Sequence, residues 1–144
     1  MYTGFLHLHD TLRWLILLSL VITLIKYLAG WLGNQSWNKV DNILGIVFTS
    51  LMDLQIITGL VLYFFLSPIT RLAFSDMRAA MKDPEVRFIT VEHFSMMILA
   101  VALVHIGRAK SKKAIPDVSK FKIASIYFLI ALGIIMSAIP WSRG

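Results

Sequence analysis

The 144-residue sequence contains no cysteine, and only 15% of its residues are charged. The lack of cysteine excludes disulfide bonds, thiolate metal sites, iron–sulfur clusters and covalently attached haem. With 58% apolar residues and a mean hydropathy of +0.75, the chain is unlike an ordinary soluble domain. The net charge of +6 comes from basic residues beside apolar runs, a pattern typical of membrane orientation and not of nucleic-acid binding.

Four apolar runs are each long enough to cross a bilayer core of about 30 Å as a helix. They cover approximately residues 5–31, 42–66, 88–107 and 121–141. Lipid offers no hydrogen-bond partners to the backbone, so spanning segments of this kind form helices. The sequence therefore predicts a single domain over residues 1–144, an all-α, up-down bundle of four transmembrane helices.

The connections between the runs also carry structural signals. Asp41 is the expected N-cap of the second helix, and Asp83-Pro84-Glu85 marks the start of the third. After Ser67-Pro68, apolar residues recur at helical spacing, which predicts a short interfacial amphipathic helix between the second and third spans.

Lysine and arginine divide unequally between the two ends of the predicted bundle. Eight lie on one side and six on the other, where acidic residues offset them. The eight are Lys26, Lys39, Arg108, Lys110, Lys112, Lys113, Lys120 and Lys122. By the positive-inside rule this side is cytoplasmic, which places both termini outside.

Ionisable side chains within the spans are costly in lipid and mark candidate functional positions. Counted back from the cytoplasmic anchors at about 1.5 Å per residue, His9 and His93 lie at nearly the same depth, towards the outer leaflet. Arg13 and Asp53 are also level with each other, which predicts a buried ion pair between the first two helices. His105 is expected to be interfacial on the inner side.

Heptad-like stripes predict which faces of the first three helices turn into the bundle. The first helix presents His9, Arg13, Ile16, Leu20, Thr23 and Tyr27. The second presents Ile46, Thr49 or Ser50, Asp53, Ile57 and Leu60. The third presents His93, Met96 or Met97, Ala100, Val104 and Gly107. The small residues Ala100 and Gly107 leave room for a flat ligand or for close helix packing, and the pattern does not separate these uses.

Two neutral imidazoles from facing helices at one depth are the arrangement that ligates a haem iron from both faces. Asp10 or Glu92 is the expected hydrogen-bond acceptor for a non-ligating ring nitrogen. Arg13 or Arg87 is the expected partner of the haem propionates.

Simpler interpretations exist for both histidines. His9 is equally compatible with an interfacial position at the start of a helix. His93 is also compatible with a hydrogen bond to Asp53 or Thr90 that only joins two helices.

Three short segments resemble small four-helix bacterial membrane proteins described as cytochrome b-like and, more loosely, the membrane part of copper-resistance CopD-type proteins. They are His7-Leu-His9-Asp10-Thr-Leu-Arg13-Trp14, Glu92-His93 and Ile139-Pro140-Trp141. The resemblance implies a bacterial inner-membrane protein with haem b held by His9, or His7, and His93. The second and fourth helices contain no histidine, so one bis-histidine haem per chain is the most that fits.

These observations predict a membrane-bound b-type cytochrome, an electron carrier rather than a stand-alone enzyme. Its expected partners are the lipid bilayer, a quinone or membrane dehydrogenase, and a redox protein, with the chain acting as a homo-oligomer or complex subunit. One alternative is a protein that handles copper or zinc through His7, His9, His93 and Glu92. Another is a cofactor-free scaffold subunit of a membrane complex.

Overall fold

The computed structural model of the chain describes residues 2–66 and 75–139, and these residues form helices and short connections without any strand. Four helical segments, Thr3–Leu32, Lys39–Phe65, Val91–Lys113 and Asp117–Ala138, are long and apolar enough to span a membrane. The predicted all-α fold with four membrane-length helices is therefore confirmed.

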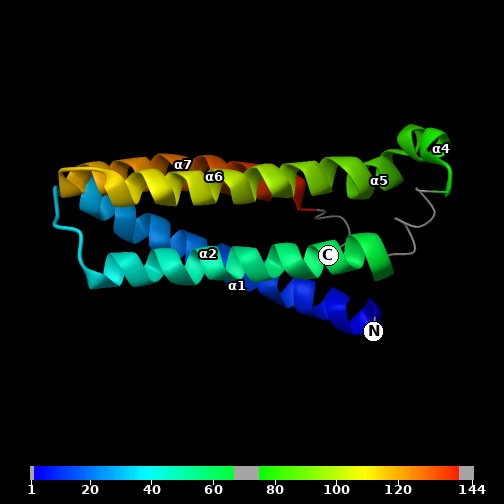
Figure 1. The fold of residues 1–144 in the computed structure, drawn as a ribbon, viewed down its shortest axis with the longest axis horizontal. Coiled ribbons are helices and arrows are strands. Elements are labelled where there is room, and N and C mark those ends of the chain that lie inside the picture. Colours follow the sequence, from blue (N-terminus) through cyan, green and yellow to red (C-terminus); the bar gives the residue numbers. More distant parts are fainter. Residues whose placement is uncertain (1, 67–74, 140–144) are drawn as a thin grey trace.

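The helices follow one another with short breaks (Figure 1). Helix α1 covers Tyr2–Leu32, and α2 covers Lys39–Val61 and continues into the π-helical segment η1, Leu62–Leu66. The short helices α4, Met77–Lys82, and α5, Pro84–Arg87, lead into the π-helical segment η2, Phe88–His93. Helices α6, Phe94–Lys113, and α7, Asp117–Ala138, complete the chain.

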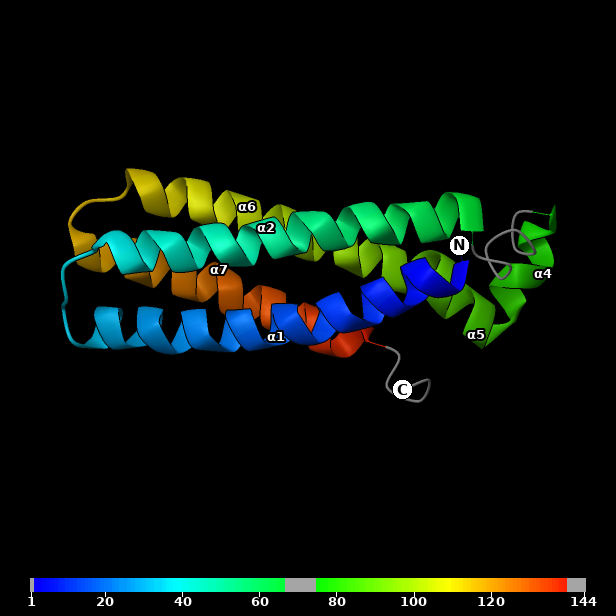
Figure 2. The same ribbon diagram turned by 90° about the horizontal axis from the view of Figure 1, so that it is seen from below.

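The four long helices form an up-down bundle in which α1 lies beside α2 and α7, and α6 lies beside α7 and α2 (Figures 1 and 2). Packing is closest between α6 and α7 and loosest between α2 and α6. We call the end with the connections 33–38 and 114–116 the basic end. The opposite end, where α1 begins and α7 ends, is called the histidine end.

The structure corrects two helix boundaries at the basic end. The third long helix does not stop at residue 107 but continues to Lys113, because lysine and arginine are good helix formers and suit a C-terminal turn. The N-cap of α2 is Asn38 and not Asp41. Asp41 is instead the third residue of a capping box, in which its Oδ2 accepts a hydrogen bond from the Asn38 backbone N–H at 3.0 Å.

Asp41 also ties α1 to α2 from a fully buried position. Lys26 Nζ donates to its Oδ1 at 2.7 Å, and the Tyr27 hydroxyl donates to its backbone carbonyl at 2.7 Å. A buried carboxylate needs hydrogen-bond partners, and here the Lys26 cation of α1 and the Asn38 backbone N–H supply them.

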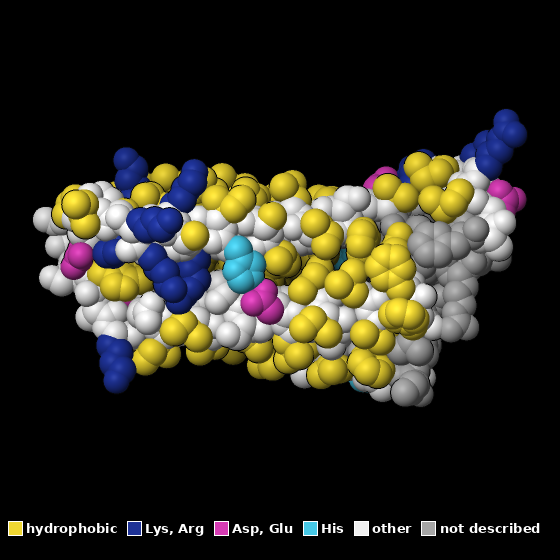
Figure 3. All heavy atoms as spheres, viewed as in Figure 1, with side chains coloured by type: hydrophobic (Ala, Val, Ile, Leu, Met, Phe, Trp, Pro, Cys, Tyr) yellow, Lys and Arg dark blue, Asp and Glu magenta, His cyan; other side chains and the backbone are white. Residues whose placement is uncertain are grey.

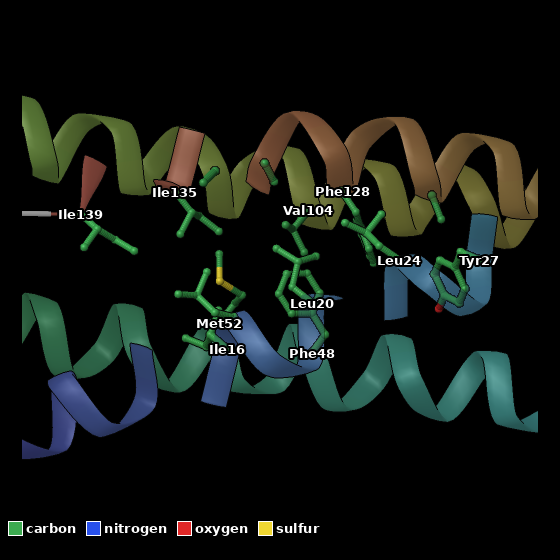
Figure 4. Packing of buried hydrophobic residues seen from close by; sticks show 14 of the residues in the cluster. Ile16, Leu20, Leu24, Tyr27, Phe48, Met52, Val104, Phe128, Ile135 and Ile139 are labelled. Atoms are coloured by element: carbon green, nitrogen blue, oxygen red, sulfur yellow. The ribbon is translucent and has the colours of Figure 1, made fainter. Parts of the chain in front are cut away.

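Aromatic and aliphatic side chains alternate with small residues in the core (Figure 4). Tyr27 contacts both Phe121 and Phe128 of α7, and Phe128 packs edge-on against Phe48 of α2. Gly107 lies directly against the Tyr127 side chain, so this glycine serves close packing of α6 on α7.

The predicted inward faces are right for two helices and wrong for one. On α1 the stripe from Ile16 to Tyr27 is buried, and on α6 Ala100, Val104 and Gly107 are buried. On α2, however, Ile46 and Ile57 are exposed, and the buried positions are Asp41, Gly45, Phe48, Thr49, Met52 and Thr58. The true inward face of α2 is therefore rotated by about one position from the predicted one.

The segment between the second and third spans is described only in part. Its helix α4 is present, while residues 67–74, which include the predicted start at Ser67-Pro68, lie outside the described residues. The start signal at Asp83-Pro84 is confirmed, because α5 begins at Pro84.

Candidate cofactor site

His9 of α1 and His93 at the end of η2 meet across the histidine end of the bundle. Their ring centroids are 6.4 Å apart, with an angle of 61° between the ring planes, and both residues are half-buried. The prediction that these two imidazoles converge from the first and third spans is therefore confirmed. His7, the alternative ligand on α1, is exposed.

The orientation of His93 is fixed by the last turn of α7. Its Nδ1 lies 2.7 Å from the backbone carbonyl oxygen of Ala138, and a carbonyl only accepts hydrogen bonds, so Nδ1 is the donor. This carbonyl is available because the last carbonyls of a helix have no partner within it, and the chain turns extended at Ile139. In the neutral ring the lone pair is therefore on Nε2, the atom that would ligate a metal.

Helix α2 holds His9 in place from the other side. The Gln55 side-chain amide donates to the His9 backbone carbonyl at 2.8 Å, and the Thr58 hydroxyl lies 3.2 Å from Gln55 Oε1. A Cβ added at Gly59 would lie 3.6 Å from His9 Nε2. Gly59 thus faces the ring nitrogen of His9 without placing a side chain against it.

Charged residues of α1 surround the histidine pair. Asp10 and Arg13 both lie close enough to His9 to act on it electrostatically, and Arg13 acts on His93 as well. The Arg13 guanidinium also lies 5.1 Å from the centre of the Trp14 ring. A cation therefore lies near the two imidazoles.

Arg87 and Glu92 pair with each other and not with the histidines. Arg87 Nε lies 3.1 Å from Glu92 Oε1, and Arg87 Nη1 donates to the Met81 carbonyl at 3.1 Å. Both side chains are well exposed. The acceptor expected from Glu92 is supplied to His93 by the Ala138 carbonyl instead.

Asp53 lies apart from this site, and the prediction that it pairs with Arg13 is wrong. Its Oδ1 is 2.6 Å from Nε2 of His105, which was expected near the inner interface. Counting residues along the helices estimates depth, but it gives no information on the side of α2 from which the carboxylate projects. Asp53 belongs to the outward stripe of α2.

The donor set favours some metal centres over others. An imidazole nitrogen binds a metal ion at about 2 Å, so two imidazoles that share one ion bring their ring centroids to roughly 6 Å. The separation of His9 and His93 agrees with this value. Within residues 2–66 and 75–139, no three His, Cys, Asp or Glu side chains are grouped to hold a metal ion. The site therefore offers two protein ligands.

Sequence reasoning missed Gln55, Gly59 and Ala138. The first two are one turn apart on α2, a spacing that would place them on one face, but neither is an ionisable residue. Ala138 acts through its carbonyl, which carries no signal in the sequence. Comparisons with protein-family models, with curated proteins and with solved structures gave no match.

Proposed function

We propose that this protein is a membrane-bound b-type cytochrome that carries electrons through one haem held by His9 and His93. The observation that carries the proposal is the 6.4 Å separation of the two imidazoles, which come from different spans. The proposal groups the chain with the small cytochrome b-like membrane proteins that its histidine segments resemble.

Haem b fits the residues that are present. A porphyrin supplies four nitrogen ligands to its iron, so two axial imidazoles complete the coordination. A zinc or copper ion held by the chain alone needs about three or four protein ligands, and the described residues group only two. Gly59 carries no side chain, so α2 places none against the ring nitrogen of His9.

The chain's own residues set the properties of the centre. When bound, haem supplies one-electron redox chemistry. The Ala138 carbonyl fixes the ring of His93 and increases the basicity of its Nε2 by accepting the Nδ1 proton in a hydrogen bond. Arg13 places a positive charge near both imidazoles, which favours the reduced state and offers a partner to a propionate.

The proposed setting is the inner membrane of a bacterium, with both termini and the histidine end outside. The chain would carry electrons between a quinone or a membrane dehydrogenase on one side and a redox protein on the other. The polar groups at the histidine end would then face the outer partner.

The proposal is tested by visible spectra of the purified protein, oxidised and then reduced. The wild type should show the bands of a b-type haem, and His9→Ala and His93→Ala should lose them. His7→Ala is the matched control, because His7 is on the same helix but exposed, and it should keep the bands. Bound metal in the purified protein without haem bands would overturn the cytochrome proposal in favour of metal handling. A protein that contains neither haem nor metal would favour the cofactor-free scaffold instead.

A further inference from the structure

A second pair of ionisable side chains lies far from the histidine end. Asp53 is in the middle third of the span Lys39–Phe65, and His105 is in the middle third of the span Val91–Lys113. Their side chains are 2.6 Å apart and remain 49% and 46% exposed. Among the described residues, each of these two side chains hydrogen-bonds only to the other.

This position is unfavourable for a single chain in lipid. Ionisable groups at membrane depth cost several kcal/mol unless they face protein or water, and hydrocarbon offers no hydrogen bonds. The second carboxylate oxygen of Asp53 has no donor among the described residues. The second oxygen of this carboxylate is therefore open to a polar partner from outside the described bundle.

The residues around the pair form two outward stripes of heptad spacing. On α2 the exposed stripe is Ile46, Ser50, Asp53 and Ile57. On α6 it is Ile98, Ala102, His105 and Ala109, all exposed. This is the face where α2 and α6 pack most loosely. Figure 3 shows a histidine beside an acidic side chain there, with Lys and Arg side chains towards the basic end and apolar side chains towards the other end. Small residues and heptad spacing are typical of contacts between transmembrane helices.

We propose that this face, named the Asp53 face after its central carboxylate, binds the same face of a second copy of the chain. Two copies inserted in one direction are related by a two-fold axis along the membrane normal, so α2 runs parallel to the α2 of the second copy. Ser50 precedes Asp53 by three residues, an offset of about 4.5 Å along the helix axis. Both side chains lean towards the N-terminus, and the longer aspartate reaches further in that direction, towards the level of the Ser50 hydroxyl of the other copy.

The Asp53 face is self-complementary because it carries both a hydrogen-bond donor and an acceptor. Each Ser50 hydroxyl donates to the Asp53 carboxylate of the other copy, and the two-fold axis forms this hydrogen bond twice. The aliphatic residues Ile46 and Ile57 of the α2 stripe pack above and below these bonds, and Ala102 and Ala109 allow the α6 helices to approach closely. A dimer thus supplies a donor to the second oxygen of each carboxylate, which lipid cannot supply.

Disulfide cross-linking tests the geometry, because the wild type has no cysteine. Ile57→Cys places a thiol on the Asp53 face, and Leu18→Cys places one on exposed α1 as the matched control. Oxidation in native membranes should give a product of twice 16.3 kDa with Ile57→Cys and not with Leu18→Cys. Equal cross-linking at both positions, none at either, or a product with a different protein would overturn the proposal.

A second measurement tests the hydrogen bonds. Förster transfer between labelled copies in vesicles should show a dimer that Ser50→Ala and Asp53→Asn each weaken by about tenfold. Ser137→Ala is the control, because its hydroxyl bonds to the Gly133 carbonyl of its own helix at 2.8 Å. A dimer whose stability is unchanged in both Ser50→Ala and Asp53→Asn would overturn the role given to this face.

Discussion

Under the cytochrome proposal, His93 is oriented for ligation by a hydrogen bond to the backbone. Its Nδ1 proton is committed to the Ala138 carbonyl, and its ring is 6.4 Å from that of His9. Gly59 faces the second ring without a side chain. At this scale the orientation of the pair depends on one backbone carbonyl as well as on the two histidines.

Two substitutions of increasing size at Gly59 test how much side chain can be placed against the ring of His9. Gly59→Ala should retain haem, because the new Cβ would make only ordinary contacts of 3.6 and 3.8 Å with the ring of His9. Gly59→Leu should displace His9 and lower the haem-to-protein ratio by at least roughly tenfold, since misplacing a ligand removes most of its coordination. Haem content and far-ultraviolet circular dichroism of both variants check this. A leucine variant that is folded and binds haem like the wild type would contradict it.

The depth of a residue could be predicted from the sequence, but its partner could not. Counting along helices placed His9 level with His93, because the rise per residue is fixed. The same counting paired Asp53 with Arg13, although the two project in different directions. Side-chain direction around a helix depends on packing, which short heptad patterns do not specify when a second interface is present.

At the scale of elements, glycines mark where helices approach each other. Gly30 of α1 faces Phe121 of α7, and a Cβ there would lie 2.5 Å from the ring. Gly133 of α7 faces open space, with nothing within 4 Å of its added Cβ. A substitution at Gly30 therefore tests the packing of α1 on α7, and a substitution at Gly133 tests helix propensity alone.

Gly30→Ala should destabilise the bundle by about 1–3 kcal/mol, because the fully buried Phe121 ring has no room to move. Gly133→Ala should be neutral or stabilising by up to about 1 kcal/mol, since alanine favours the helix. Unfolding in mixed micelles under increasing denaturing detergent measures both. A Gly30 variant as stable as the Gly133 variant would show that α1 and α7 are not packed as described.

The stripe on α2 explains why the inward face of that helix was misassigned. Ile46, Ser50, Asp53 and Ile57 have the spacing of a packed helix face, yet the Asp53 side chain is half-exposed and the other three residues are exposed in the single chain. Periodicity indicates that a face is packed, but not whether the partner is the same chain. Under the dimer proposal, this pattern describes an interface between copies.

For the whole molecule, the fold and the number of spans follow from apolar length alone. The boundaries at the basic end do not, because Arg108–Lys113 is polar in sequence and still helical. Orientation in the membrane remains a prediction from the distribution of lysine and arginine, and it decides which compartment the histidine pair faces.

Cysteine labelling of intact cells measures that orientation. Gln35→Cys lies in the connection at the basic end, and Met77→Cys lies on exposed α4 at the histidine end. An impermeant maleimide should label Met77→Cys in intact cells and Gln35→Cys only after permeabilisation, because the more basic side stays cytoplasmic. The cysteine-free wild type is the blank, and the reverse pattern would place the histidine pair inside.

The most direct measurement on the central claim is low-temperature electron paramagnetic resonance of the purified ferric protein, together with its haem content. Two imidazoles from one chain predict one low-spin haem per chain, and His9→Ala should convert it to a high-spin species or release it. A wild-type protein that contains no haem, or haem whose spin state is the same in wild type, His9→Ala and His93→Ala, would contradict the account.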